Sequence, residues 1–468
     1  MIDQARQAAY ELLTAVRQDD AYANLVWPRI LARHELTGRD AAFATDLAYG
    51  TLRWQGLYDA IAGQCSARPW SEVDPQLVDV VRLGIHQLLS MRVPDHAAVD
   101  SSCELAKSIG YQDAGRIGFV NGVLRAVSRR SLEQWEQDIA ASLAGGRSSD
   151  AALATLTSHP QWIVSAIRQA LQVHEGVTVT DDQVRAALLA DNEPSRPTIA
   201  LLEGARGGTR EERTREEGLE NESGVRPGRW SPIAAIVESG LPSQVPAVKE
   251  HRAIVQDEGS QLVVQALLDV AVSPPESAWL DMCAGPGGKA ALLADAAERV
   301  GVEFVAVELH EHRAELVRRL IGAAIDAKRV EVIVGDATTR PWGSRFFDRI
   351  LLDAPCTGLG ALRRRPEARW RRRESDVADL TSLQRRLLDV GLSSLRSGGV
   401  LAYVTCSPHI AETIDVVDEV LLHREDIEIL DARPHMPQVP DLGPGPHAQL
   451  WPHLHETDAM HISLLRRV

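Results

Sequence analysis

The 468-residue chain has few cysteines, few lysines and no long apolar run. Its five cysteines are odd in number and form no CxxC pair, which argues against a disulfide framework and against a zinc site. No apolar run reaches the roughly 18 residues of a membrane-spanning helix. The first ten residues lack the basic start and apolar core of a secretion signal. We therefore expect a cytoplasmic protein with reduced thiols, no metal and no membrane association.

Two of the cysteines each follow a short apolar run. Residues 349–352 precede the segment DAPCTGLG with Cys356, and residues 400–404 precede TCSPH with Cys406. Such runs predict buried strands of a parallel sheet. Ligands of an open α/β sheet bind outside the carboxyl ends of its strands, so the two thiols are expected to meet over one substrate.

A glycine-rich turn follows another predicted strand. Residues 278–280 lead into DMCAGPGGK at 281–289, and residues 290–299 have the pattern of a helix. Glycines let the backbone approach a ligand, and the helix N-terminus offers unpaired N–H groups. The spacing is not that of a phosphate-binding P-loop, and Pro286 removes one donor. This turn is therefore better suited to a carboxylate or a ribose than to a triphosphate.

Acidic residues end four predicted strands at successive strand–loop junctions. They are Asp281, Glu308, Asp336 and Asp353. Four such junctions predict one ligand site at the edge of a doubly wound α/β sheet, with Glu308 placed to bind ribose hydroxyls. Lysine occurs at only four positions, so Lys289 beside the glycine turn indicates a required compact ammonium group. Its partner could be Asp281, Asp353 or the ligand.

These motifs resemble those of S-adenosylmethionine-dependent RNA (cytosine-5) methyltransferases, and the whole chain resembles the RsmB type that acts on small-subunit ribosomal RNA. The matching segments are DMCAGPGGK, Glu308 with Arg313 behind it, GDA at 335–337, DAPCTGLG, RRRPEARW and TCSPHIAE. The resemblance implies a Rossmann-like sheet of seven strands, one of them antiparallel. It also implies that S-adenosylmethionine is the cofactor, bound by Cys283, Ala284, Gly285, Pro286, Gly287, Gly288, Lys289, Glu308, Arg313, Asp336 and Asp353.

The resemblance further implies covalent catalysis at cytosine. C5 of the base is a poor nucleophile, and addition of a thiolate at C6 creates an enamine whose C5 can attack the methyl group. Cys406 would be the attacking thiolate, Cys356 would assist proton removal or enzyme release, and Asp353 would bond the pyrimidine edge. A thiol with a pKa of about 8.5 is scarcely ionised at neutral pH. Lys289 or the arginines after Cys356 would have to lower that pKa.

Alternative assignments remain open at this stage. DNA cytosine-5 methyltransferases use the cysteine of a Pro-Cys motif, which is Cys356 here, whereas the additional Thr-Cys-Ser motif favours RNA and Cys406. The same pair of motifs argues against a protein or DNA substrate. Transfer RNA is the alternative RNA substrate. A noncatalytic RNA-binding ribosome-assembly factor is a further alternative, although it predicts degraded motifs and these are intact.

Two positions depart from the family's usual pattern. Gly285 stands where alanine is common, and Glu308 stands where aspartate is frequent. Neither difference is expected to abolish cofactor binding, but both are expected to change its affinity.

The formal net charge of −15 is unfavourable for RNA binding, because phosphate contacts dominate such affinity. Positive charge is concentrated in residues 361–373, ALRRRPEARWRRR, which contain seven arginines and one tryptophan. Arginine interleaved with an aromatic residue suits phosphate contacts combined with base stacking. We expect Arg365, Arg369 and Trp370 to bind RNA.

The chain is predicted to have three parts. Residues 1–140 show helical spacing of apolar side chains, and YGTLRW (49–54) and FVNGVLR (119–125) resemble an all-α NusB-like RNA-binding domain. Residues 141–250 are a predicted connector. Within it, residues 203–228 are rich in Gly, Glu and Arg and cannot bury enough surface to offset ordering entropy, so a disordered insertion is expected. Residues 251–468 are the predicted methyltransferase domain of a monomer.

Overall fold

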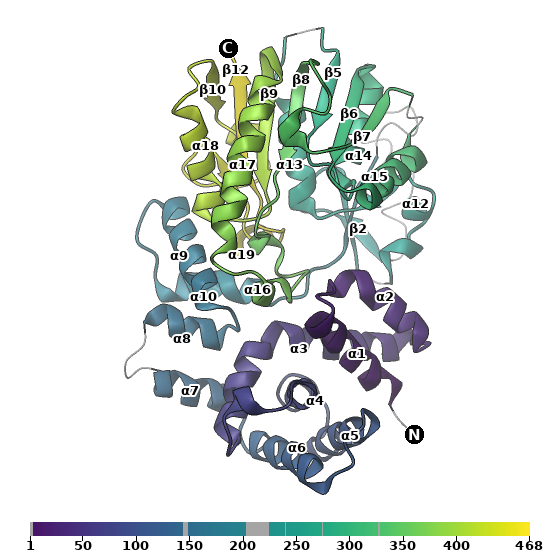
Figure 1. Ribbon diagram of the computed structural model, residues 1–468, viewed down its shortest axis with the longest axis vertical. Coiled ribbons are helices and arrows are strands. Elements are labelled where there is room, and N and C mark those ends of the chain that lie inside the picture. Colours follow the sequence, from purple (N-terminus) through teal and green to yellow (C-terminus); the bar gives the residue numbers. More distant parts are fainter. Residues whose placement is uncertain (1–2, 144–147, 203–223, 239, 274, 326–327) are drawn as a thin grey trace. The chain divides into compact units, whose positions relative to one another are not determined.

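The computed structural model describes residues 3–143, 148–202, 224–238, 240–273, 275–325 and 328–468 (Figure 1). The chain divides into two compact units. The first consists of Met1–Ser165, Thr180–Glu193 and Leu362–Arg372, and the second of Ala166–Val179, Pro194–Ala361 and Arg373–Val468. No helix in the described ranges is long and apolar enough to cross a membrane.

The first unit is helical. Its helices are α1 (Gln4–Gln18), α2 (Ala23–Arg33), α3 (Gly38–Cys65), α4 (Pro75–Leu89), α5 (Asp95–Ser108), α6 (Ala114–Val127), α7 (Leu132–Leu143), α8 (Ser149–Leu156), α10 (Asp181–Ala190) and the short α16 (Ala368–Arg371). Helix α4 begins at a proline, and the side chain of Asp74 caps it by accepting a hydrogen bond from the N–H of Gln76. Leu12, Leu47 and Leu77 are completely buried in its core. The described residues of this unit form no strand, which confirms the all-α prediction.

Helix α9 (Gln161–Glu175) begins in the first unit and ends in the second, which is built on a large sheet. The strand order is β10-β12-β9-β8-β5-β6-β7, and the short β11 pairs with β12. The strands are β5 (Ala278–Asp281), β6 (Glu303–Glu308), β7 (Val330–Val334), β8 (Phe347–Asp353), β9 (Leu395–Thr405), β10 (Ile427–Leu430), β11 (Ala448–Gln449) and β12 (His461–Arg467). Strands β5 to β9 pair in parallel, whereas β12 runs antiparallel to β9 and β10.

Helices cover both faces of this sheet, as Figure 1 shows. They are α13 (Glu258–Asp269), α14 (Gly288–Val300), α15 (Glu311–Ala324), α17 (Asp376–Ser393) and α18 (Ile414–Leu421). The second unit also contains the short helices α12 (Pro246–Lys249) and α19 (Pro452–His455). Successive strand residues point to opposite faces. Trp279 of β5 packs in the cluster that contains α13 and α14, whereas Leu280 packs with α17 and α18. The predicted doubly wound α/β domain is confirmed.

A small antiparallel sheet precedes the large one in the chain. It consists of β1 (Thr198–Leu201), β2 (Val225–Pro227), β3 (Ala234–Val237) and β4 (Ala253–Val255), in the order β2-β3-β1-β4. Residues 203–223 of the predicted insertion lie outside the described residues. The prediction of disorder up to residue 228 is wrong at its end, because β2 is hydrogen-bonded to β3.

The second unit also begins earlier in the chain than the predicted domain boundary. Pairing of β1 with β4 joins residues 198–201 to residues 253–255, and the second unit includes the chain from Pro194. Most of the second half of the predicted connector 141–250 therefore belongs to the second unit. The boundary at residue 251 does not coincide with the observed division.

The order of the parallel strands determines where a ligand can bind. From β5 the chain proceeds to β6 and β7 on one side, and then returns to place β8 on the other side of β5. Such a reversal opens a crevice at the carboxyl ends of the strands. Asp281 ends β5 and Asp353 ends β8, and Asp353 lies opposite Val404 of β9.

Candidate active site

The two predicted thiols lie together. Strands β8 and β9 are hydrogen-bonded neighbours, and the loops after them bring Sγ of Cys356 to 3.4 Å from Sγ of Cys406. The backbone N–H of Gly360 donates to the carbonyl of Cys406 at 2.8 Å. A Cβ atom at position 360 would lie only 2.0 Å from the carbonyl oxygen of Ala459, so glycine is required for this close approach.

The two thiols have opposite electrostatic environments. The hydrogen bond from Cys356 is the main cause that lowers the pKa of Cys406, and the charge of Lys289 lowers it further against the effect of burial. The same hydrogen bond, together with burial, raises the pKa of Cys356 well above its ordinary value. Of the two thiols, Cys406 is therefore the one that ionises more readily.

Lys289 stands at the start of α14 and reaches the end of β8. Its Nζ donates to Oδ2 of Asp353 at 2.8 Å, which selects one of the three partners that the sequence left open. Burial acts to lower the pKa of Lys289, but the charge and hydrogen bond of Asp353 outweigh it and the net pKa is raised. The ammonium group thus stays charged beside the thiol pair.

The glycine-rich turn connects β5 to α14 and is built around a buried acid. Asp281 is completely buried, and its Oδ1 accepts a hydrogen bond from the N–H of Cys283 at 3.2 Å. Its Oδ2 is also buried and has no hydrogen-bond partner. Burial, followed by the charge of Asp353, raises the pKa of Asp281 to about 8. Gly287 has a φ of +121°, a conformation that favours glycine.

Residues after β6 hold the turn from the other side. Oε2 of Glu308 accepts from the N–H of Gly285 at 3.1 Å, and its Oε1 accepts from the N–H of His310 at 3.0 Å. The guanidinium of Arg313 donates to the carbonyl of Gly285 at 2.5 Å. Asp336 is instead exposed, and hydrogen bonds from the side chain and backbone of Thr338 lower its pKa.

These contacts connect most of the predicted site residues to one another at the same edge of the sheet. Three acidic side chains, Asp281, Glu308 and Asp353, lie there with Lys289 and Arg313. This acidic edge suits a ligand that has positive charge and hydroxyl donors. Within the described ranges no three His, Cys, Asp or Glu side chains are grouped so as to hold a metal ion.

One predicted RNA contact is wrong. Arg369 has no exposed surface, and its guanidinium donates to Oδ1 of Asn192 at 2.6 Å and to the carbonyls of Ser158, Asp191 and Arg53 at 3.1, 3.3 and 3.4 Å. Burial lowers the pKa of Arg369 to about 10. All of its hydrogen-bonding partners lie in the helical unit, so this arginine holds that unit together and is not available to phosphate.

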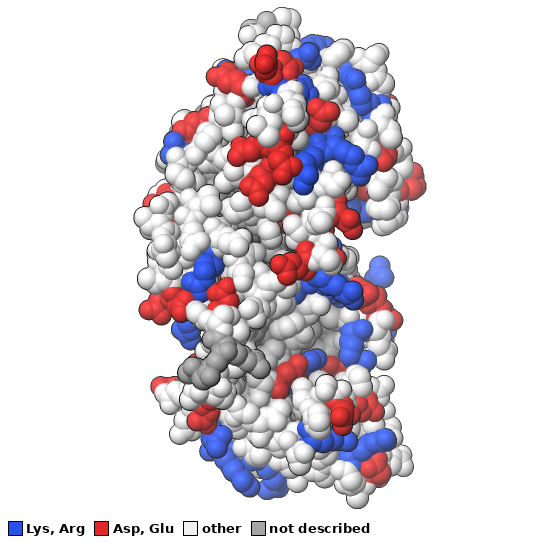
Figure 2. Space-filling model, turned by 60° about the vertical axis from the view of Figure 1, so that its left-hand side comes forward, with Lys and Arg blue, Asp and Glu red and all other residues white. Residues whose placement is uncertain are grey.

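The other two predicted contacts are accessible. Arg365 is exposed and stacks over the ring of Tyr22 at 5.5 Å, and Trp370 is 37% exposed. Basic and acidic side chains are interspersed on the face drawn in Figure 2, so the net negative charge does not make that face uniformly acidic. Their contact with RNA stays a prediction.

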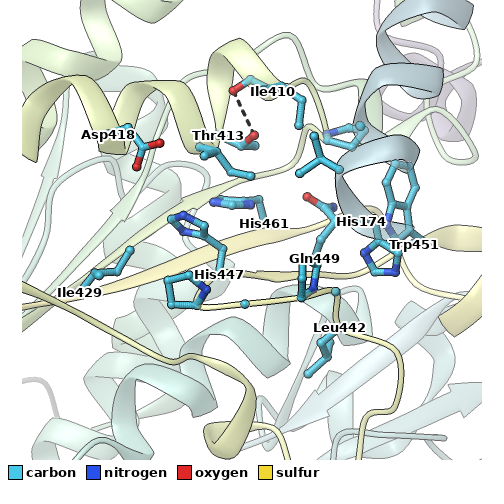
Figure 3. A pocket seen from close by; sticks show the side chains of 18 of the residues that line it. His174, Ile410, Thr413, Asp418, Ile429, Leu442, His447, Gln449, Trp451 and His461 are labelled. Carbon is cyan, nitrogen blue, oxygen red and sulfur yellow. Dashed lines mark hydrogen bonds between the residues drawn. The ribbon is translucent and has the colours of Figure 1, made fainter. Parts of the chain in front are cut away.

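The sequence reasoning missed a cavity of about 340 Å³ near the second cysteine loop. Pro408, Ile410 and Thr413 line it, and Figure 3 shows the imidazoles of His447 and His461 side by side in it. His461 begins β12, and His447 directly precedes β11. Burial is the main cause that lowers the pKa of both histidines, which favours their neutral forms. The cavity is therefore uncharged over most of its lining.

Known proteins resemble this chain over its whole length. Residues 269–466 match the family described as 16S rRNA methyltransferase RsmB/F, and residues 3–129 match the NusB family. A putative methyltransferase of Mycobacterium tuberculosis is 46% identical over 100% of this chain and 97% of its own length. The ribosomal RNA small subunit methyltransferase B of Pseudomonas syringae is 31% identical over 95% of this chain and 92% of its own length. The chain belongs to the RsmB/F methyltransferase family.

The fold of this RsmB/F family member has a close counterpart among solved structures. The crystal structure of PH0851 covers 100% of this chain and 99% of its own, with a TM-score of 0.76 at 20% identity. At that identity the likeness supports the fold alone. Family membership confirms the resemblance that the motifs carried.

The two departures from the family pattern compensate each other. A Cβ atom at position 285 would lie 2.1 Å from Oε2 of Glu308, so the longer glutamate occupies the space that an alanine side chain would need. Aspartate at 308 is one methylene shorter and would leave that space open. The glycine and the glutamate are thus a matched pair.

This pairing gives a double-mutant prediction. Gly285→Ala alone pushes the carboxylate of Glu308 away from the turn, and Glu308→Asp alone withdraws it from the N–H of Gly285. We expect each single change to weaken S-adenosylmethionine binding about tenfold, equivalent to about 1.4 kcal/mol, and the double change to restore most of the affinity. Isothermal titration calorimetry measures all four proteins, and additive losses in the double variant would contradict the pairing.

Proposed function

We propose that this RsmB/F family member transfers a methyl group from S-adenosylmethionine to C5 of a cytosine in small-subunit ribosomal RNA. The step would proceed through a covalent bond between Cys406 and C6 of the base. The observation that supports this reaction is the pair of thiols 3.4 Å apart with opposite pKa shifts. One thiol is prepared to attack and the other retains a proton, as covalent catalysis at cytosine requires.

The acidic edge of the sheet fits the cofactor. Oδ2 of Asp281 is buried and unpartnered, and a cationic group of the cofactor beside it would lower the pKa of Asp281 and favour its carboxylate form. Glu308 is an acceptor for ribose hydroxyls. Cys283 to Lys289, Arg313, Asp336 and Asp353 would complete the binding residues. When bound, S-adenosylmethionine supplies an electrophilic methyl group on a positively charged sulfur, which the surrounding carboxylates favour.

The chain's own residues account for the remaining steps. The Cys406 thiolate adds to C6, and the electron pair displaced into the ring makes C5 nucleophilic, while Asp353 bonds the pyrimidine edge. Once Cys406 is a neutral thioether, the charge and hydrogen bond that raised the pKa of Cys356 are lost. Cys356 then ionises more readily, releases its proton to solvent, and as a thiolate takes the proton from C5 of the methylated base. The electron pair of the broken C5–H bond re-forms the C5–C6 double bond, and Cys406 leaves C6 as a thiolate.

Ribosomal RNA is favoured as the substrate by the family matches. Residues 269–466 match a family described as 16S rRNA methyltransferases, and residues 3–129 match the NusB family. The helical residues 1–140, with exposed Arg365 and Trp370, would supply RNA contacts. Transfer RNA, and a noncatalytic role in ribosome assembly, are the alternatives that an experiment must separate.

The direct test uses the full chain with S-adenosylmethionine labelled on its methyl group. Transcripts of 16S ribosomal RNA, a transfer RNA pool and duplex DNA are incubated separately, and the digested nucleosides are resolved by chromatography. We expect label only in 5-methylcytidine from ribosomal RNA. Label in another nucleoside would contradict C5 specificity, label only in transfer RNA would change the substrate, and no label in any nucleic acid would favour the assembly factor.

Activity should depend on pH through Cys406. Because the thiolate is the reactive form, kcat rises as pH increases through the pKa of Cys406, and that inflection lies below the value of an ordinary thiol. Lys289→Met removes the nearby positive charge and moves the inflection to higher pH. At saturating cofactor we expect kcat at pH 7 to fall roughly 10- to 100-fold, with a smaller loss at high pH.

The matched control for this experiment is Lys249→Met, because Lys249 is exposed and lies in α12. Its pH profile should coincide with that of the wild type. A Lys289→Met profile that is lowered equally at every pH would show that Lys289 does not act on thiol ionisation.

A further inference from the structure

Glu412 is a buried acid that is hydrogen-bonded to the loops of both Cys356 and Cys406. It ends the short helix η5 (Ile410–Glu412) and has no exposed surface. Its Oε1 accepts from the backbone N–H of Thr357 at 2.7 Å and from Nε2 of Gln384 at 3.3 Å. Its Oε2 accepts from the hydroxyl of Ser407 at 2.7 Å and from that of Thr357. Four donors thus converge on one carboxylate.

Two of the residues that donate to Glu412 are sequence neighbours of the two cysteines. Thr357 directly follows Cys356, and Ser407 directly follows Cys406. The hydroxyls of Thr357 and Ser407 also lie 3.1 Å apart. One carboxylate therefore binds the residue next to each thiol and holds the two loops in a fixed relation.

A second contact restrains the first loop from its other side. Gln384 of α17, which donates to Glu412, also donates to the carbonyl of Pro355 at 2.8 Å. Pro355 directly precedes Cys356, so this thiol is flanked on both sides by residues of the same hydrogen-bond network. The hydroxyl of Tyr403 donates to the backbone carbonyl of Glu412 at 2.7 Å and fixes η5 to β9.

Burying a carboxylate is unfavourable unless hydrogen bonds compensate it, and the recorded donors to Glu412 are neutral groups. A leucine or methionine would fill the same space without that penalty. An acid at this position needs another explanation, and the chemistry beside it supplies one. The hydrogen bond between the two sulfur atoms depends on their spacing, and it shifts the pKa values of the two thiols in opposite directions.

We propose that Glu412 is a positioning residue for the covalent step, because it fixes the loops of Cys356 and Cys406 so that their sulfur atoms stay within hydrogen-bond distance. This role rests on the proposed function, since it concerns the reaction of the thiol pair. Glu412 touches neither thiol and acts through Thr357 and Ser407. Its negative charge has a second effect, as it helps to raise the pKa of Cys356 and so keeps the donor thiol protonated.

The informative substitution is Glu412→Gln, which keeps the shape and removes the charge and one acceptor oxygen. We expect kcat to fall by roughly 10- to 100-fold, the usual effect of removing a group that orients a catalytic residue, with KM for S-adenosylmethionine unchanged. Alkylation of Cys356 by iodoacetamide, followed by mass spectrometry, should begin at lower pH than in the wild type. A residue that only stabilises the fold would not shift this alkylation profile.

The matched control is Asp348→Asn. Asp348 is also a buried acid that accepts backbone hydrogen bonds, from Ser277 at 2.6 Å and Ala278 at 3.0 Å, but it lies at the amino end of β8. Both variants should lose thermal stability, whereas only Glu412→Gln should lose kcat. Thr357→Val provides a milder second variant if Glu412→Gln folds poorly, and its loss should not add to that of Glu412→Gln.

The rate of covalent complex formation with RNA containing 5-fluorocytosine separates the outcomes. A slow complex in Glu412→Gln, beside a normal rate in Asp348→Asn, supports the positioning role. Equal rates in the two variants, with a complex formed by the wild type, overturn this role and leave the proposed function intact. No complex with the wild type overturns the covalent mechanism and the positioning role together.

Discussion

Cys406→Ser should abolish the covalent complex with RNA that contains 5-fluorocytosine, whereas Cys356→Ser should retain it. The fluorine at C5 cannot leave as a proton does, so an enzyme bonded to C6 stays attached to the RNA. The hydrogen bond from Cys356 and the charge of Lys289 lower the pKa of Cys406, which is why we propose it as the attacking sulfur. Loss of the nucleophile should lower kcat by a factor on the order of 10⁴ to 10⁶.

A denaturing gel measures the complex directly after incubation with S-adenosylmethionine. Cys356→Ser should slow turnover at the later proton-removal step while the covalent band persists. Cys103→Ser, which changes a half-buried cysteine in the helical unit, is the control and should match the wild type. A band that disappears in Cys356→Ser and persists in Cys406→Ser would reverse the assignment in favour of the DNA-type mechanism.

Arg369→Met should destabilise the helical unit severely. The substitution leaves the amide oxygen of Asn192 and carbonyls such as that of Ser158 buried without their donor. Leaving a buried acceptor without its donor typically costs about 1–3 kcal/mol, and because several acceptors are affected we expect a loss of about 3 kcal/mol in the free energy of unfolding. Arg365→Met, in the same arginine run but exposed, should change it by less than about 0.5 kcal/mol.

Hydrogen exchange followed by mass spectrometry can locate this effect in the full chain. Faster exchange is expected in α3 and α10, because Arg369 bonds to residues at or beside these helices, while strands β5 and β8 of the other unit keep their protection. The two arginines should also separate in RNA binding, with Arg365→Met weakening it while stability is preserved. Equal destabilisation by both substitutions would contradict the buried role of Arg369.

Much of the catalytic sheet could be predicted from local patterns. The apolar runs before Asp281, Glu308 and Asp353 marked buried strands, because a parallel strand covered on both faces must be apolar along its length. The rule that such strands align their carboxyl ends then brought Cys356 and Cys406 together before any distance was known.

Other features depended on contacts between distant parts of the chain. The arginines of residues 363–373 look alike in the sequence, yet carbonyls from three separate segments bury Arg369 and leave Arg365 exposed. The pairing of β1 with β4 could not be predicted from the sequence, because short strands have weak periodicity and their pairing is non-local. The charged segment between these strands further obscured it.

The sequence by itself determined which chemical groups are present and at which strand ends they stand. Only the tertiary structure decided that Lys289 pairs with Asp353, that Gly285 makes room for Glu308, and that Glu412 joins the two cysteine loops. The physical reason is range: strand and helix patterns arise from neighbouring residues, whereas burial and hydrogen-bond partners depend on whatever the fold brings within about 3 Å.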